Sequence, residues 1–415
     1  MDIRKYLMGL SFAIMGCGLA ACSSSSDDGD GSGGGNGGGT PPDKIEDVKA
    51  EMPERSNSMK VYAHFMPWFE TNATCLDKGK WGWHWTMNAS LNPALGEIAS
   101  HYHPLTGAYA SGDPVVLDYQ CLLMKYSGIE GVMVDWYGAD ADNTTARHTS
   151  NTEALFKAIQ KAGMKMVIVY EDQTLTSASD AVGKAREDMS YLAKHFFGSD
   201  SYAQVNGKPL LLVFGPQGLQ TPKDWFRAFQ TLGTKPAFVV LNGHSDKAND
   251  ASYTNSIGEY LWVNPTPENW YASNKSKFEM LIGGAMPGFN DYYKEGGSGD
   301  GYTKYDDEGG ALFDRQLKAA KDAGLQWLQI STWNDYGEGT IIEPTKEFGY
   351  RFLTKLQTFT GVKYQESDLQ QIFRWYQLKV KYANDAAKSK KLDECYGYFN
   401  ALQPDKATAL MSTIE

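Results

Sequence analysis

The sequence predicts a (β/α)8 barrel (TIM barrel) with an appended C-terminal helical hairpin. Segments typical of buried strands alternate with segments typical of amphipathic helices between residues 43 and 362. The strand-like segments are nearly continuous apolar runs, as expected for parallel strands that are buried on both faces. Repeated strand–helix units over roughly 300 residues are typical of this barrel. An open, doubly wound sheet is the alternative, but no glycine-rich nucleotide motif follows any strand.

Turn and capping residues delimit the expected elements. The first long helix, for example, has Asp113 as its cap and Pro114 in its first turn, and it stops before Gly128. The eight expected strands are 61–66, 131–136, 165–170, 209–214, 237–241, 260–263, 280–285 and 326–331. The expected barrel helices are 114–127, 152–162, 179–197, 222–232 and 311–323. Residues 363–415 should add helices 369–382 and 386–402, packed on the barrel as a hairpin.

The N-terminus predicts export and lipid anchoring. Residues 1–21 combine basic residues with a small, short apolar run, which is typical of a signal peptide rather than a membrane span. The run ends in Leu-Ala-Ala-Cys at Cys22, which resembles the lipobox of bacterial lipoproteins; this implies cleavage before Cys22 and its lipidation. An ordinary secretory signal with a stray cysteine is the alternative. Residues 22–42 are rich in Ser, Gly and Asp and should form a disordered tether. We therefore expect a chain held by lipid at a bacterial (outer) membrane of the cell envelope, periplasmic or on the cell surface.

Composition narrows the class of partner. The net charge of −11 argues against nucleic acid. The 11 Trp and 24 Tyr suit sugar recognition, in which flat aromatic faces stack on pyranose rings. Cys75, Cys121 and Cys395 lack the spacing of a metal site, so we expect no metal and no cofactor. One disulfide among these three cysteines stays open, and we expect a monomer.

Polar and aromatic clusters follow five of the eight expected strands. Functional residues of such barrels lie just past the C-terminal ends of the strands, so these clusters should share one rim. The candidate substrate-binding residues in them are His64, Trp68, Asp135, Trp136, Tyr137, Glu171, Asp172, Trp333 and Asn334. A core histidine at His64 and a bracing role for Asp135 are the alternatives.

The strongest cluster lies in the segment 330–344. Asp335 and Glu338 are three residues apart, between glycines at Gly337 and Gly339. Two acids held close together can hydrolyse a glycosidic bond, because one stays protonated while the other stays ionised. We predict Glu338 as the general acid and Asp335 as the base. A capped loop whose acids bind backbone amides is the alternative.

A family resemblance supports this prediction. The segments 61–70, 128–138, 167–174 and 330–340 resemble glycoside hydrolase families 71 and 99, over about residues 55–360. These families are α-glycan-cleaving (β/α)8 barrels: endo-α-1,3-glucanases in the first, and endo-α-mannosidases or mannanases in the second.

The resemblance also implies roles for individual residues. It makes Asp335 and Glu338 the catalytic pair, and it places Trp136 and Glu171 around the reacting sugar. Family 99 typically has glutamate where this chain has Asp335, which looks closer to family 71.

The resemblance leaves the substrate open. Family 99 is understood to retain configuration through attack by the substrate's own 2-hydroxyl, which requires that group trans to the leaving group, as in an α-mannoside. In an α-glucoside the 2-hydroxyl is cis to the leaving group, so hydrolysis needs another route. We expect hydrolysis of α-1,3-glucan with inversion, since the shorter Asp335 leaves room for water. Endo-α-mannosidase or mannanase activity with retention is the alternative, as is a non-catalytic glycan-binding lipoprotein.

A long loop after the first strand adds aromatic residues. Trp81, Trp83 and Trp85 lie within five residues, and with Trp68 they should lengthen a cleft for cleavage of internal bonds. A small satellite core under the loop is the alternative. The Gly- and Asp-rich segment 294–310 is expected to be a mobile rim loop near the site.

Overall fold

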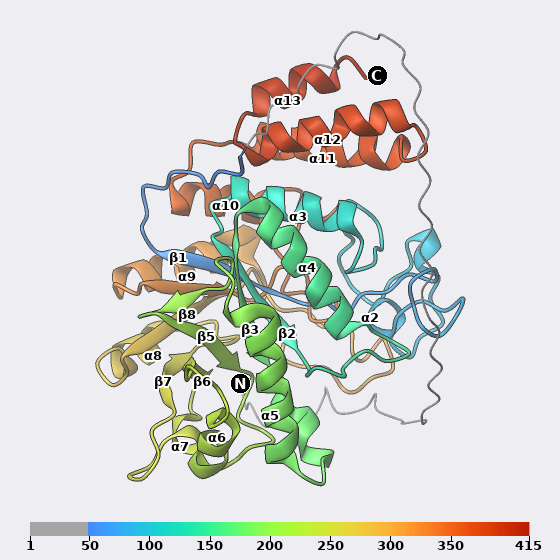
Figure 1. The fold of residues 1–415 in the computed structure, drawn as a ribbon. Helices are drawn as coiled ribbons and strands as arrows, with labels where there is room; N and C mark the ends of the chain where they lie inside the picture. Colours follow the sequence, from blue (N-terminus) through green and yellow to red (C-terminus); the bar gives the residue numbers. More distant parts are fainter. Residues whose placement is uncertain (1–48, 415) are drawn as a thin grey trace, which may run out of the picture. The chain divides into compact units, whose positions relative to one another are not determined.

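The computed structural model describes residues 49–414, so the expected signal peptide, Cys22 and the tether lie outside the described residues. Eight parallel strands close into a barrel in the order β1-β2-β3-β5-β6-β7-β8-β9, with β9 paired to β1 (Figure 1). The strands are β1 Lys60–Phe65, β2 Gly131–Trp136, β3 Lys165–Tyr170, β5 Lys208–Val213, β6 Ala237–Leu241, β7 Ser256–Tyr260, β8 Met280–Ala285 and β9 Trp327–Ile330. A two-residue strand, β4 (Gln204–Val205), pairs antiparallel with β5. The predicted fold class is confirmed.

Helices connect the strands on the outside of the barrel. The connecting helices are α3 Pro114–Tyr126, α4 His148–Ala162, α5 Ala181–Leu192, α6 Pro222–Phe229, α7 Ser245–Ala248, α8 Glu268–Asn274, α9 Ala311–Asp322 and α10 Arg351–Thr360. The short α7 and α8 and the closing α10 were not expected. A further four-residue helix, α2 (Trp83–Thr86), lies in the loop between β1 and α3.

One strand was placed wrongly from the sequence. The expected strand at 260–263 is instead β7 at Ser256–Tyr260. Its sequence SIGEY lacks an apolar run, and Gly258 allows the chain to approach β8: a Cβ at this glycine would lie 1.7 Å from the carbonyl oxygen of Met280. Close backbone contact replaces apolar side chains here, so hydrophobic patterning missed the strand.

Alternation along each strand decides which side chains reach the site. Val132, Val134 and Trp136 of β2 join the apolar layer between strands and helices. Because successive side chains point to opposite faces, Asp135 points into the barrel. The same rule sends His64 of β1 inward, where its Nδ1 lies 3.4 Å from Oε1 of Gln329 on β9.

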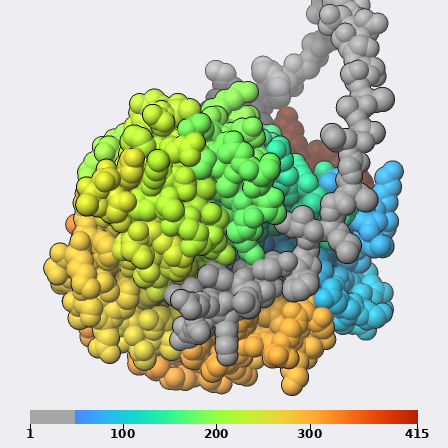
Figure 2. Space-filling view, turned by 90° about the horizontal axis from the view of Figure 1, so that it is seen from below, coloured from blue at the N-terminus to red at the C-terminus, as the bar shows by residue number. Residues whose placement is uncertain are grey.

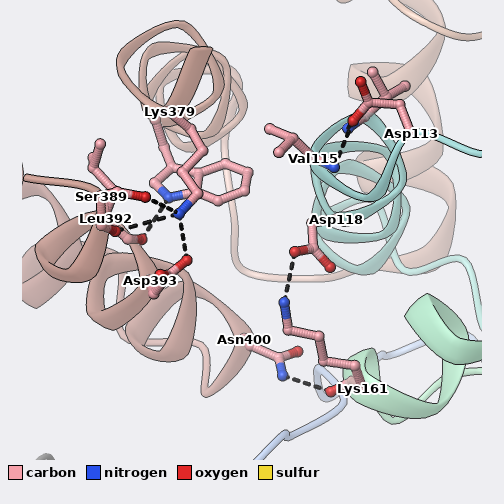
Figure 3. Close-up of polar contacts among 11 residues, drawn as sticks. Asp113, Val115, Asp118, Lys161, Lys379, Ser389, Leu392, Asp393 and Asn400 are labelled. Atoms are coloured by element: carbon pink, nitrogen blue, oxygen red, sulfur yellow. Dashed lines mark hydrogen bonds and ion pairs between the residues drawn. The ribbon is translucent and has the colours of Figure 1, made fainter. Parts of the chain in front are cut away.

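Three helices follow the barrel instead of the expected two. They are α11 Glu366–Lys381, α12 Ala386–Asn400 and α13 Pro404–Met411, which lie together beside α3 (Figure 1). Asn400 anchors them: its Nδ2 donates to the carbonyl of Lys161 at 2.8 Å, and Lys161 pairs with Asp118 of α3 at 2.6 Å (Figure 3). Buried Lys125 donates to the carbonyl of Asn400 at 2.8 Å. The three helices therefore pack along the outside of the barrel against α3.

Two further expectations concern the described residues. Cys75, Cys121 and Cys395 are all free and buried, so the disulfide left open from the sequence is absent among them. Between residues 49 and 414 there is no helix with the length and apolarity needed to cross a membrane.

Candidate active site

The turn after β9 holds the predicted acid pair. The amide of Asp335 donates to Oγ1 of Thr332 at 2.8 Å, and the amide of Glu338 donates to Oδ1 of Asp335 at 3.0 Å. Asn334 fastens this turn to the end of β1, because its side chain bonds both the amide and the carbonyl of Met66, at 2.8 and 3.0 Å. Asn334 is fully buried, so it positions the pair and does not contact a sugar itself.

The loop after β8 covers Glu338. The hydroxyl of Tyr293 donates to Oε1 of Glu338 at 3.1 Å, and the amide of Asn290 donates to the carbonyl of Glu338 at 2.9 Å. A tyrosine hydroxyl hydrogen-bonded to a carboxyl oxygen fixes the orientation of that carboxyl group. The Gly-rich segment 294–310 begins directly after Tyr293, which places the expected rim loop beside the turn that carries Asp335 and Glu338.

A second pair of acids stands at the ends of β2 and β3. Asp135 and Glu171 are both buried and hydrogen-bonded to each other, and Tyr137 also bonds Asp135. Burial raises the pKa of both carboxyls, and for Glu171 the neighbouring Asp135 raises the pKa further. Two buried acids in contact cannot both ionise, so Glu171 stays protonated and its hydroxyl donates a hydrogen bond to the carboxylate of Asp135.

The two pairs influence each other. Burial raises the pKa of Asp335 to about 7, and the charge of Asp135 contributes to the rise. The amide of Glu338 acts in the opposite direction, because it stabilises the ionised form of Asp335. Asp335 is therefore balanced between its two protonation states near neutral pH, as a general base should be.

Polar atoms without partners mark where a ligand can bind. Among the described residues, Oδ1 of Asp135, Oε2 of Glu171 and the hydroxyl of Tyr260 are buried and unpaired. Tyr260 ends β7; burial raises its pKa, and the neighbouring acid pair adds to the rise. Buried polar atoms are normally satisfied, so these three can accept or donate bonds to sugar hydroxyls.

His64 lies deeper on the inner face. It is buried and in edge contact with Trp262, with ring centroids 4.7 Å apart. Burial lowers the pKa of His64 to about 3, so the ring is neutral at any working pH. Its bond to Gln329 fits the bracing core histidine that the sequence left as the alternative.

Three other candidates lie away from the sugar-binding side. Trp136 and Trp333 belong to the outer apolar layer, and Trp136 stacks on Tyr191 of α5 at 5.8 Å. Asp172 accepts the amides of three consecutive residues, 217–219, at 2.8–3.0 Å, and so braces the loop after β5. Alternation explains the position of Trp136: Asp135 faces inward, so its neighbour Trp136 faces outward. The expected sugar contacts of these three residues are corrected accordingly.

The tryptophans of the loop after β1 divide into two groups. Trp85 is fully buried against Phe69 and Tyr336, and its Nε1 donates to the carbonyl of Tyr109 at 2.8 Å. It belongs to the satellite core, which corrects its expected sugar contact. Trp83 is partly exposed, which leaves its ring accessible for stacking.

Trp68 lies at the inner edge of this loop. It stacks on His84 with ring centroids 4.0 Å apart. The Nε1 of Trp68 and the Nδ1 of His148 are buried without a partner in the described part of the chain. Tyr137 contacts His148 at 4.4 Å and also bonds Asp135, so these rings adjoin the inner acid pair.

We expect Trp83→Ala and Trp85→Ala to differ sharply. Removing the buried Trp85 ring should cost about 3–5 kcal/mol of unfolding free energy. Removing the partly exposed Trp83 should leave stability nearly unchanged and weaken polymer binding by about tenfold, from lost stacking. Thermal unfolding and affinity electrophoresis in glycan gels measure the two effects. Equal melting temperatures for the two variants would contradict the division.

Sequence reasoning missed two functional side chains. Tyr293 follows a weak strand in the motif NDYYKEGG, and its aromatic residues after a strand end were the available signal. Glu343 is buried beneath the catalytic turn and accepts bonds from Gln120, Tyr109 and Tyr336, at 2.7, 2.8 and 2.8 Å. Burial raises its pKa to about 7. These contacts join distant segments, and local patterns do not reveal them.

The assembled site contains two acid pairs and neutral aromatic walls. Among residues 49–414 no group of three or more His, Cys, Asp or Glu side chains is arranged to hold a metal ion. Buried carboxylates past the C-terminal ends of β2, β3 and β9 of a closed barrel are the arrangement of a barrel glycoside hydrolase.

Comparisons with known proteins narrow this class. The model of Glycosyl hydrolase family 99 matches residues 79–366. The chain belongs to glycosyl hydrolase family 99. A protein of Danio rerio described as glycoprotein endo-alpha-1,2-mannosidase-like is 21% identical over 292 residues, which are 63% of this chain and 64% of that protein. The chain thus matches less than two thirds of the length of that relative.

Solved structures agree on the fold. The GH99 endo-alpha-mannosidase from Bacteroides thetaiotaomicron in complex with BIS-TRIS-propane has a TM-score of 0.58 at 17% identity, over 77% of this chain and 99% of that chain. A second structure of that enzyme has a TM-score of 0.57 at 19% identity, over 76% and 98% of the two chains. The resemblance to family 71 receives no support from these comparisons.

Proposed function

We propose that this protein is an endo-acting α-mannoside hydrolase. Its membership of family 99 together with the buried pair Asp335 and Glu338 carries the proposal. The relatives described as endo-α-mannosidases favour mannoside over the α-1,3-glucan expected first. The partly exposed Trp83 beyond the acids suits a chain that extends past the cleaved bond.

Each acid has a separate task in this proposal. Glu338, oriented by Tyr293, protonates the leaving glycosidic oxygen. Asp335 removes a proton from the attacking hydroxyl. The ionised Asp135 contributes negative charge near the developing positive charge of the sugar ring, and Glu171 and Tyr260 bond its hydroxyls.

The substrate's stereochemistry supports a mannoside. In an α-mannoside the 2-hydroxyl lies trans to the leaving group, so it can attack the anomeric carbon from the back once Asp335 deprotonates it. Water then opens the resulting three-membered ring, and the configuration is retained. In an α-glucoside the 2-hydroxyl is cis, and the same acids could not use it.

We expect kcat/KM to fall on the acidic side of about pH 7, because burial and Asp135 raise the pKa of the base Asp335 to about that value. The base must be ionised in the free enzyme, so protonation below this pH removes activity. Asp135→Asn removes a negative neighbour and lowers the pKa of Asp335. The acidic limb should then move to lower pH, while the exposed control Asp405→Asn leaves it in place. An unshifted limb in Asp135→Asn would contradict the coupling.

A substrate panel tests the proposal. Incubating residues 43–415 with yeast α-mannan should release oligosaccharides of several lengths, while α-1,3-glucan stays intact. Release of monosaccharide alone would contradict endo action. Cleavage of the glucan alone would overturn the choice of mannoside.

We also propose that Cys22 anchors the chain to the cell envelope. The Leu-Ala-Ala-Cys motif and the tether that follows support this location. We expect the full chain to fractionate with membranes and Cys22→Ala to be released in soluble form. A membrane-bound Cys22→Ala variant would contradict the anchor.

A further inference from the structure

The turn that ends α2 joins two loops at the rim of the site. Met87 leaves the helix with a left-handed φ of 46° and is buried, while its neighbour Asn88 is exposed. The loop after β1 (blue) and the loop after β8 (orange) lie next to each other in Figure 2. Met87 and Asn88 make contacts across this junction.

Asn88 uses its backbone and both ends of its side chain in these contacts. Its amide donates to the carbonyl of Gly296 at 2.9 Å, and its Nδ2 donates to the carbonyl of Gly297 at 3.0 Å and to Oγ of Ser298 at 3.2 Å. Its Oδ1 accepts from Nε1 of Trp83 at 3.2 Å. One residue therefore holds the exposed tryptophan on one side and the β8 loop on the other.

Met87 fills the space beneath that junction. A Cβ on Gly296 would lie 2.4 Å from the sulfur of Met87, and one on Gly337 would lie 3.1 Å from its terminal methyl carbon. Met87 thus packs between the β8 loop and the glycine that separates Asp335 from Glu338. The packing requires glycine at Gly296, because a Cβ there would also lie 2.9 Å from the carbonyl oxygen of Tyr292.

The β8 loop continues the connection to the general acid. The amide of Tyr292 donates to the carbonyl of Gly337 at 2.9 Å, and the hydroxyl of Tyr293 donates to Glu338 at 3.1 Å. Hydrogen bonds therefore run from the Trp83 ring through Asn88 and the β8 loop to the Glu338 carboxyl. Side chains in contact along such a chain can transmit a change in order.

We propose that Met87 and Asn88 are positioning residues that couple occupation of the Trp83 ring by a distal sugar to the placement of Glu338. The proposal rests on the proposed function, because it assigns Trp83 to the same glycan. With this coupling, kcat depends on the length of the substrate. A glycan chain that reaches Trp83 orders the β8 loop and thereby aligns Glu338. If Met87 and Asn88 only anchored the loop, substituting them would lower the stability of the protein without changing kcat.

Asn88→Asp tests the contact with the β8 loop separately from the contact with Trp83. The variant keeps an oxygen for Trp83 but loses both Nδ2 donor bonds to the β8 loop. Asn92→Ala is the matched control, since Asn92 lies in the same loop and bonds Ala94 without touching the β8 loop. The kinetic comparison uses two manno-oligosaccharides, one that reaches Trp83 and a shorter one that does not.

The substitution should lower kcat and leave KM unchanged. We expect Asn88→Asp to lower kcat on the longer oligosaccharide by about tenfold while KM stays unchanged, because two hydrogen bonds that order the β8 loop are lost. A loss confined to KM, or a kcat unchanged relative to Asn92→Ala, would overturn the coupling.

Hydrogen exchange tests the connection without a substrate. We expect Asn88→Asp to speed exchange of the amides of residues 290–298 and of Glu338, and Asn92→Ala to leave them protected. Unchanged exchange in Asn88→Asp would overturn the inference. A wild-type chain inactive on every glycan would instead refute the proposed function, and the exchange result would still decide whether the connection exists.

Discussion

Asp335→Asn and Glu338→Gln should each lower kcat/KM on α-mannan by roughly 10²–10⁴-fold, the usual contribution of a general base or acid. Each substitution keeps the shape of the side chain, and an amide oxygen at position 335 can still accept the amide of Glu338. The loss should therefore come from chemistry and not from unfolding. Initial rates of reducing-end release measure it.

Circular dichroism and thermal unfolding provide the control for this prediction. Glu308→Gln removes a fully exposed carboxylate that pairs with Arg315, and its rate should match that of the wild type. Near-full activity of Asp335→Asn or Glu338→Gln with an intact fold would contradict the assignment of these two residues as base and acid.

Glu343→Leu should produce a large loss of stability. It leaves the donors of Gln120, Tyr109 and Tyr336 buried without an acceptor. Each such group costs about 1–3 kcal/mol, so the free energy of unfolding should fall by at least about 3 kcal/mol. Activity should fall as well, because Tyr336 lies between the two catalytic acids. Denaturant titration measures the stability.

Glu343→Gln is the matched control. Its amide oxygen can still accept from Tyr109 and Tyr336, and its new NH2 group can meet the unpaired Oε1 of Gln120 after that amide rotates. We expect stability close to the wild type. An equal loss in the Gln and Leu variants would show that these hydrogen bonds do not hold the turn.

The parts of the site that follow from local rules could be predicted. Apolar runs and capping residues located seven of the eight strands, and the position of Asp335 and Glu338 after a strand placed both at the correct rim. The missed strand, β7, depends on close backbone packing at Gly258, which hydrophobicity does not record. The period of two along β2 already implied that Asp135 and Trp136 face opposite sides.

Contacts between distant segments could not be predicted. Trp83 and Trp85 have the same local surroundings in the sequence, and only the path of the loop over Phe69 and Tyr336 buries one of them. Tyr293 contacts Glu338 from a loop that lies 45 residues earlier in the chain. Glu343 contacts Tyr336 from beneath the turn. The proposal of mannan over glucan rests on the family, because the positions of the two acids alone do not identify the sugar.

Proton NMR of the first product formed from α-mannan tests the central claim most directly. Attack by the 2-hydroxyl, with Asp335 as base and Glu338 as acid, retains the configuration. We expect the α-anomer of the new reducing end to appear first and the β-anomer to grow in later by mutarotation. Initial appearance of the β-anomer would show inversion by water and would contradict attack by the 2-hydroxyl.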